Sequence, residues 1–225
     1  MKSEDVIVCC GVGQWYPRGV DRLGRSLNYH GWGGDTILWR NEYPPGCPTH
    51  QQVPYAFKLA AIEHAGNVLG YNRILWVDSS VWCVADPLPI FHRIATDGYY
   101  LWDSIFAVGT WTNDRCLSSF GMSRDEAMAV PMLSANVIGL HWQNGTAREF
   151  MRQWREAMDR GDFAGSWIRQ EGDAEDERYQ GHRHDQSAAS IIAHRLGMSL
   201  DAPGNLCQYY APTMPDTVVL TLRGM

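Results

Sequence analysis

A strongly apolar run that stops at an acid, ILWVDSSVW (Ile74–Trp82), limits the folds open to this chain. The segment RILWV is apolar after its first residue, which is typical of a strand buried on both faces of a parallel sheet. A helical stripe of apolar residues at positions 57, 61, 65 and 68 precedes this segment, and Gly70 closes that helix. The run therefore predicts an α/β protein with Asp78 at the carboxyl end of a buried strand.

The rest of the chain repeats this alternation of strands and helices. Short apolar runs predict strands at 5–10, 36–39, 73–77, 98–102, 134–142 and 218–222. Helical periodicity predicts helices at 19–31, 55–70, 146–158 and 185–196. Together they predict a single α/β, Rossmann-like domain with a mostly parallel central sheet flanked by helices. We expect a nucleotide-binding half over residues 1–95, an acceptor-binding half over residues 96–225 and a mobile loop at 169–184.

The composition indicates in which compartment the protein is located and which kinds of partner it binds. A net charge of −6 and a pI near 5.7 weigh lightly against a nucleic-acid partner. The six cysteines lack CxxC spacing, which favours reduced thiols over a disulfide framework or a zinc site. The charged N-terminus is unlike a signal peptide, and no run approaches the ~18 apolar residues of a membrane span. We therefore expect a cytoplasmic protein without a membrane span.

A carboxylate at a strand end can serve a ligand. In open α/β sheets ligands bind beyond the carboxyl ends of the strands, and Asp78 is expected there. It would hold a divalent cation, which in turn neutralises a diphosphate. The alternative is that Asp78 only closes the following turn, with Ser79 and Ser80 as partners.

The segment around Asp78 resembles a known motif. PYAFKLAAIEHAGNVLGYNRILWVDSSVWCVADPLPIF is similar to the DxD segment of GT-A-fold nucleotide-sugar glycosyltransferases, with Asp86–Pro87 at the downstream turn. The resemblance implies that Asp78, Ser79 and Ser80 contact the donor, and that Asp78 and Ser80 bind Mn²⁺ or Mg²⁺. Ser80 replaces the second acid of the motif, and a hydroxyl is a poorer metal ligand than a carboxylate.

A second block, GHRHDQSAASIIAHRLGM, resembles the DQDxLN element of glycogenin-like and lipooligosaccharide galactosyltransferase-like enzymes. The resemblance implies that Asp185 contacts the transferred sugar and that Gln186 lies near the anomeric carbon, so these two are the expected catalytic residues. Arg183 and His184 would help to bind the donor. Ser187 replaces the second acid of this element. The alternative is that Asp185 is simply the N-cap of the helix.

A third block, SANVIGLHWQNGTAREFMRQW, resembles the strand whose small residues face the donor sugar in the same enzymes. The matching positions are Ser134, Ala135 and Asn136, and the alternative is a plain core strand. The resemblance spans roughly Val6 to Gly197 and extends to phage and bacterial GT-A-like proteins with WxDSS and RHDQS blocks.

Further contacts follow from the resemblance and from the aromatic content. The loop after the first strand would wrap the nucleotide base, although a lone GxG is more often only a turn; its residues are Gly11, Val12, Gly13, Gln14, Trp15 and Tyr16. Lys58 would reach a phosphate, unless it lies on a solvated helix face. Sugar-stacking aromatics and short polar residues suggest an acceptor site, although buried core is the commoner fate of such tryptophans; these residues are Trp102, Asp103, Trp111, Asn113 and Asp114.

These motifs predict a hexosyltransferase. The donor would be a nucleotide diphosphate sugar, with a UDP-sugar favoured, and the acceptor a hydroxyl group on a glycan, a lipid-linked sugar, a protein or a modified DNA base. The resemblance implies retention of the anomeric configuration; inversion would follow if Asp185 acted as a general base. The alternatives are a sugar-binding module without catalysis and a nucleotidyltransferase, which ranks lower because no GxGxRxxPxTK-like loop follows the first strand.

Overall fold

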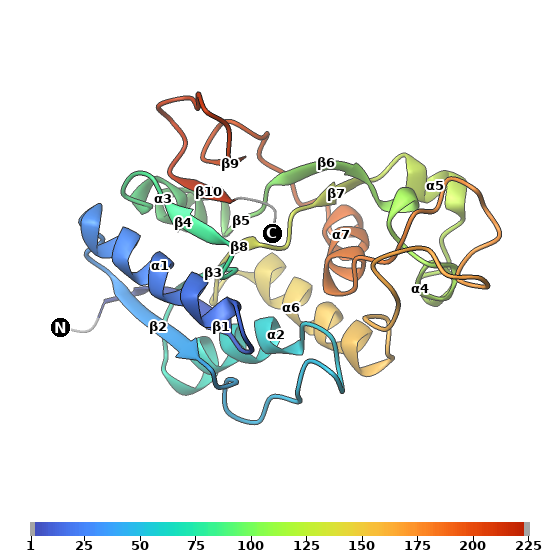
Figure 1. The fold of residues 1–225 in the computed structure, drawn as a ribbon, viewed down its shortest axis with the longest axis horizontal. Coiled ribbons are helices and arrows are strands. Elements are labelled where there is room, and N and C mark those ends of the chain that lie inside the picture. Colours follow the sequence, from blue (N-terminus) through green and yellow to red (C-terminus); the bar gives the residue numbers. More distant parts are fainter. Residues whose placement is uncertain (1–2, 223–225) are drawn as a thin grey trace.

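The computed structural model describes residues 3–222, and its centre is a five-stranded sheet with the order β2-β1-β3-β8-β5 (Figure 1). The strands are β1 (Asp5–Gly11), β2 (Asp35–Arg40), β3 (Arg73–Val77), β5 (Tyr99–Tyr100) and β8 (Val137–His141). β1 pairs in parallel with β2 and β3, whereas β8 is antiparallel to both of its neighbours. All strands except β8 therefore run in one direction, and the predicted mostly parallel sheet is confirmed.

Helices cover both faces of this sheet. Val6 and Val8 of β1 pack with α2 (Ala56–Glu63), α6 (Gly145–Asp159) and α7 (Asp185–Arg195). Ile7 and Cys9, which point the other way, pack with α1 (Tyr16–Tyr29) and α3 (Leu88–Asp97). Successive strand residues point to opposite faces, so a sheet covered on both sides needs continuously apolar strands.

Two smaller sheets flank the central one. β4 (Val81–Cys83), β10 (Leu220–Leu222) and β9 (Cys207–Tyr209) form a three-stranded sheet in that order. β6 (Asp103–Ala107) pairs with β7 (Pro131–Leu133) and leads from the sheet toward α4 (Asp114–Ser119) and α5 (Arg124–Met128) (Figure 1). The sequence motifs predicted neither β6 and β7 nor α4 and α5, because each of these elements is only three to six residues long and shows little periodicity.

Several predicted boundaries differ from the structure. The first helix starts three residues early, at Tyr16, because Pro17 is tolerated in a first helical turn, where its missing N–H is not needed. The helix α2 continues as a π-helical turn (His64–Val68), which shifts the phase of the stripe, so Val68 is 68% exposed. Residues 134–136 form a turn before β8 rather than the start of a strand.

The segment 169–184 contains no helix or strand, as predicted for a loop, but it is tied to itself by hydrogen bonds. The guanidinium of Arg169 donates to the backbone carbonyls of Ala174, Asp176 and Tyr179. All six cysteines are free thiols, and only Cys47 is not fully buried. No helix within residues 3–222 is both long and apolar enough to cross a bilayer.

Candidate functional site

A cleft of about 760 Å³ opens where β1 and β3 end. Gly11 is the last residue of β1, and Asp78 directly follows β3. Because β8 runs antiparallel to β3, the turn 134–136 that precedes β8 reaches the same edge. The start of α7 completes the wall. Twelve of the predicted site residues line this cleft: Gly11, Val12, Tyr16, Lys58, Asp78, Ser79, Ser80, Ser134, Asn136, Arg183, Asp185 and Gln186.

Lys58 joins the elements that meet at the cleft. Its ammonium donates to the carbonyl of Ala135 at 2.9 Å and lies 3.3 Å from Asp78 Oδ1 and 3.1 Å from Asp185 Oδ2. An ammonium has three N–H donors, and each of them has an oxygen within reach here. The side chain is only 3% exposed, so the alternative of a solvated helix face is wrong. Lys58 thereby links α2, the end of β3, the turn before β8 and α7.

The charges of Lys58, Asp78 and Asp185 affect the pKa values of Lys58 and Asp185. Burial alone would lower the pKa of Lys58, but the nearby carboxylates of Asp185 and Asp78 outweigh it, and the pKa is raised. Burial raises the pKa of Asp185 to about 6; Lys58 opposes this shift, and the negative charge of Asp78 adds to it. One lysine between two acids leaves a net negative charge at neutral pH.

The carboxylate of Asp78 is held by its own strand. Its Oδ1 accepts a hydrogen bond of 2.7 Å from the indole of Trp76, two residues earlier on the same side of β3. Its backbone N–H donates to the carbonyl of Asn136. The side chain faces Trp76 and Lys58 instead of closing the Ser79–Ser80 turn, as the alternative required, and it remains 26% exposed.

The turn after Asp78 is fixed by α1. Arg22 donates to the carbonyls of Ser79 and Ser80, at 3.3 and 2.7 Å, and stacks on Trp82. Gly19 lies against the same turn, where a Cβ atom would come within 2.0 Å of the Ser79 carbonyl oxygen. The close approach of α1 to this turn therefore requires glycine at position 19.

Asp185 and Gln186 open α7. The N-cap of α7 is His184, whose side chain makes no capping bond, so the alternative of Asp185 as the N-cap is wrong. Trp154 donates to the backbone carbonyl of Asp185, and the side chain of Asp185 faces Lys58. Gln186 Oε1 accepts a bond of 3.3 Å from the Ala135 N–H, which leaves the amide NH₂ of Gln186 to serve the cleft.

Arg183 enters the cleft between two tryptophans. Its guanidinium carbon lies 3.9 Å from the centre of the Trp111 ring and 4.1 Å from that of Trp167. On either side of it, His182 bonds the Asp162 carbonyl and His184 the Phe163 carbonyl. The two histidines thus tie this segment to residues 162–163 at the back, and Arg183 between them lines the cleft.

The other predicted residues lie outside the cleft. Trp15 is 64% exposed on the surface, and Gly13 and Gln14 are beside it. Ala135 is buried, and only its backbone takes part in the cluster. The remaining residues have other partners in the structure: His184 bonds Phe163, Trp102 is fully buried and bonds Asn136, Asp103 bonds the backbone of Ile105, Asn113 caps α4, Asp114 pairs with Arg124, and Trp111 stacks on Arg183. The aromatic-core alternative is therefore correct for Trp102.

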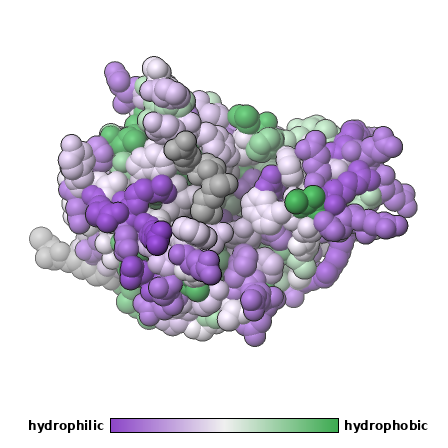
Figure 2. All heavy atoms as spheres, viewed as in Figure 1, coloured by the Kyte–Doolittle hydropathy of each residue, from purple (hydrophilic) through white to green (hydrophobic). Residues whose placement is uncertain are grey.

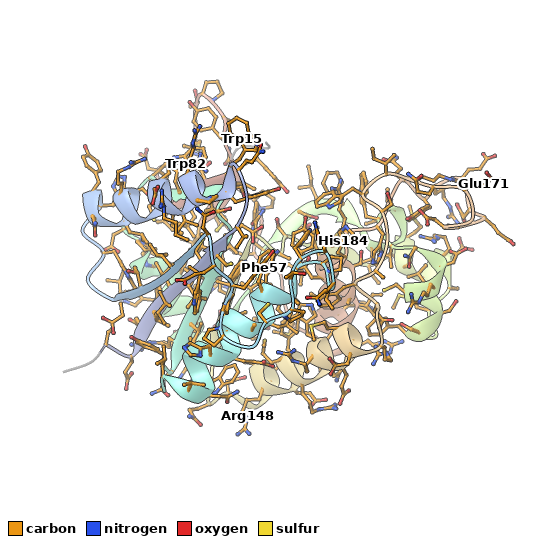
Figure 3. The ribbon with its side chains drawn as sticks, turned by 60° about the horizontal axis from the view of Figure 1, so that its bottom comes forward. Trp15, Phe57, Trp82, Arg148, Glu171 and His184 are labelled. Atoms are coloured by element: carbon orange, nitrogen blue, oxygen red, sulfur yellow. The ribbon has the colours of Figure 1, made fainter. Side chains whose placement is uncertain are left out.

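The structure adds cleft residues that the motifs did not indicate. Tyr55 lies with its ring 5.1 Å from Lys58 Nζ and 5.3 Å from the ring of His184. His50, Trp167 and Tyr209 also line the cleft. These residues come from loops or from a short edge strand, where no periodicity marks the side that faces a ligand. In Figure 3 Phe57, which lines the cleft, has His184 to its right and Trp15 above it.

The expected divalent cation can be compared with the oxygen atoms that are present. Within residues 3–222 no three His, Cys, Asp or Glu side chains gather closely enough to hold a metal ion. Asp78 supplies one partly exposed carboxylate, and Ser80 only a hydroxyl. Mg²⁺ commonly binds through one or two carboxylates together with substrate phosphates and water. The residues therefore fit a cation that arrives with a diphosphate, and not a site built from protein ligands alone.

The fold is similar to that of a solved glycosyltransferase. The chain aligns with the crystal structure of a glycosyltransferase involved in the glycosylation of the major capsid of PBCV-1, with a TM-score of 0.52. The alignment covers 97% of this chain and 92% of that chain, at 14% sequence identity. No protein-family model and no curated protein sequence matches the chain. The class that this architecture defines is a glycosyltransferase-like, Rossmann-like α/β fold.

Proposed function

We propose that this protein transfers a hexose from a nucleotide diphosphate sugar, with a UDP-sugar favoured, to a hydroxyl acceptor. The observation that carries the proposal is the convergence of Asp78, Lys58 and Asp185 in one cleft at the carboxyl ends of β1 and β3. Ligands of open α/β sheets bind at this edge. The glycosyltransferase-like fold agrees with the proposal.

The nucleotide would bind at the β1 end, where Gly11, Val12 and Tyr16 line the cleft. The diphosphate would lie beside Asp78 and the Ser79–Ser80 turn. A diphosphate needs positive charge there, because the Lys58 cluster is itself net negative. Mn²⁺ or Mg²⁺ held by Asp78, with help from Ser80, would neutralise the leaving diphosphate when bound with the donor.

The sugar would lie against α7. The Asp185 carboxylate is fixed by Lys58 and would accept hydrogen bonds from the sugar hydroxyls, while the Gln186 NH₂ would donate near the anomeric carbon. Because Asp185 is only 3% exposed and is bound to Lys58, it is better suited to orient the donor than to remove a proton from an acceptor. This geometry favours retention over inversion.

Thermal-shift measurements with UDP-glucose, UDP-galactose and GDP-mannose, with and without Mn²⁺, test the proposal. A stabilisation that is specific to one donor follows from binding linkage, and Asp78→Ala should abolish it. Thr217→Ala, which alters an exposed hydroxyl bonded to the carbonyl of Gly204, is a control that should respond as the parent does. An Asp78→Ala protein with the parent's donor response would overturn the assignment of this carboxylate.

The products formed by the parent protein separate the alternatives. Slow release of UDP from the donor, with a free or transferred hexose, supports a transferase. Donor binding without any turnover supports a sugar-binding module, and release of pyrophosphate from a nucleoside triphosphate and a sugar phosphate supports a nucleotidyltransferase. NMR of the anomeric proton in the first product distinguishes retention from inversion.

A further inference from the structure

The guanidinium group of Arg183 is stacked between two aromatic rings in the lining of the cleft. The indoles of Trp111 and Trp167 stack on its guanidinium at 3.9 and 4.1 Å. Within residues 3–222 this guanidinium makes these two ring contacts, but it forms neither an ion pair nor a hydrogen bond. A guanidinium carries its five N–H donors in its own plane, so stacking on the rings uses none of these donors.

The surrounding backbone holds this arrangement firmly. The N–H of Arg183 donates to the carbonyl of Trp111, which also accepts a bond of 2.7 Å from the Ser187 hydroxyl. A Cβ atom on Gly181 would come within 2.1 Å of the Trp167 carbonyl oxygen. The segments that carry the arginine and both indoles are therefore in close contact. A long, flexible side chain is pre-ordered here, which lowers the entropy cost of binding.

Arg183 reaches the cleft from other segments of the chain than those of the proposed diphosphate site. The Ser79–Ser80 turn and Tyr16 belong to the β1–β3 end of the cleft. Arg183 precedes α7 and lies between indoles from the segments 111–113 and 162–168. In Figure 3 His184, the neighbour of Arg183, lies apart from Trp15, which precedes α1.

The rim beside Arg183 is apolar. Ile105 and Phe106 of β6 line the cleft while they are 71% and 40% exposed, and Figure 2 shows hydrophobic surface over β6. Phe106 also contacts the ring of Trp111 edge-on. Aromatic and aliphatic surface suits the face of a sugar ring, and one fixed cation within it suits an anionic substituent.

We propose that Arg183, held between Trp111 and Trp167, binds a carboxylate or phosphate group on the acceptor, so that the acceptor is an anionic sugar. The identification of the anionic sugar as an acceptor rests on the proposed transferase function. The anion site itself rests on the stacked guanidinium, which has no ion pair within residues 3–222. A carboxylate or a phosphate would bind the edge of the guanidinium through two parallel N–H···O bonds.

Direct binding to the full chain tests the inference without any turnover. Dissociation constants are measured by NMR for three probes that share one ring: methyl β-glucoside, methyl β-glucuronide and methyl β-glucoside 6-phosphate. The parent should bind at least one anionic probe about tenfold or more tighter than the neutral one. The glucuronide and the phosphate arms tell the two anionic groups apart.

Three variants complete the experiment. Arg183→Gln removes the charge and should reduce the preference for the anionic probe about tenfold or more, and Arg183→Lys should retain part of it because the charge remains but the planar fork is lost. Arg148→Gln makes the same charge change at an exposed residue of α6, well away from His184 in Figure 3, and should keep the parent's preference.

Two results would overturn the inference. One is a parent that binds the neutral probe as well as both anionic ones. The other is an Arg183→Gln protein with an unchanged preference; a UDP affinity at least tenfold weaker in the same protein would assign Arg183 to the donor. If the parent binds no UDP-sugar but Arg183 still determines the anion preference, the proposed transferase function fails while this anion site stands.

Discussion

At the β1–β3 end of the cleft the functional side chains project from regular elements, whereas at the Arg183 end they project from segments without helix or strand. Lys58 belongs to α2, and Asp78 follows β3 directly. Arg183 and Trp167 belong to the irregular stretch between α6 and α7. The first end is held by an ion-paired cluster, and the second by neutral bonds from rings to carbonyls, such as those of His182 and His184.

This difference separates a half of the site whose residues the sheet positions from a half that irregular segments position. Strand ends in a sheet are positioned by the whole ladder, so a residue there keeps its place when neighbouring loops change. Loops tolerate changes in length and sequence far more readily. Under the proposed function, the donor would bind at the first end and the acceptor at the second.

The largest expected effect comes from breaking the ion-paired cluster. Lys58→Met would leave the buried carboxylate of Asp185 without its cation, and loss of one member of a buried pair costs about 3–5 kcal/mol of unfolding free energy. Urea denaturation measures this. Glu63→Gln breaks a half-exposed pair with Arg155 near the other end of α2 and should cost about 1 kcal/mol or less. Similar losses in the two variants would contradict the role of Lys58.

The Arg183 end can be weakened separately. His182 is fully buried, and burial lowers its pKa to about 4, so the ring is neutral at pH 7. His182→Phe would leave the Asn113 N–H and the Asp162 carbonyl without their partner, at about 2–3 kcal/mol of unfolding free energy. The exposed His194→Phe is the matched control. Anion binding should weaken in His182→Phe more than UDP binding does. An equal loss of both affinities would contradict the separate stabilisation of the two ends of the cleft.

Substitutions of two glycines in α1 test whether the β1–β3 end requires close contact between α1 and the Ser79–Ser80 turn. Gly19→Ala would press a methyl group onto the Ser79 backbone and should cost about 1–3 kcal/mol, with weaker UDP binding. Gly24→Ala meets only the flexible side chain of Leu38, at 3.2 Å, and should stabilise the helix by up to about 1 kcal/mol. Calorimetric titration with UDP, together with melting curves, checks both. Equal UDP affinity in the two variants would refute the requirement for close contact.

The smallest expected effect is a dependence on pH. With a pKa raised to about 6 by burial, Asp185 is ionised at pH 7.5 and mostly protonated at pH 5, so UDP-sugar affinity should fall about tenfold over this range. A raised folded-state pKa means that the folded protein binds this proton more tightly than the unfolded chain. Asp185 therefore adds stability as the pH falls through 6, and its protonation does not itself promote unfolding. Asp185→Asn should bind more weakly and lose this pH dependence; a dependence identical to the parent's would exclude Asp185 as its source.

Much of the fold could be predicted because its signals are local. The strands β1 and β3 and the helices α6 and α7 were found near their true positions, since a continuous apolar run or a helical stripe reports burial directly. The antiparallel pair of β6 and β7 was not predicted, because the two short strands are separated by α4 and α5 and their pairing depends on tertiary contacts. The single-domain organisation and the boundary near residue 95 stay predictions.

The site was predicted unevenly for a related reason. Asp78, Asp185 and Gln186 stand at element ends that periodicity marks, and the structure brings them to one cleft. Their functional roles stay predictions. Trp102 and Asn113 are of residue types that often bind sugars. In the structure, however, Trp102 is buried in the core and Asn113 caps α4. Composition alone does not distinguish an aromatic ring that meets a ligand from one that fills a core.

The sequence by itself determined the α/β architecture and put a carboxylate at the end of a buried strand, because both follow from the order of apolar and polar residues along the chain. The tertiary structure decided that Lys58 is buried between Asp78 and Asp185 and that Arg183 is enclosed by Trp111 and Trp167. Each of these contacts joins residues far apart in the chain. Such partners are chosen by the packing of whole elements, to which no local pattern refers.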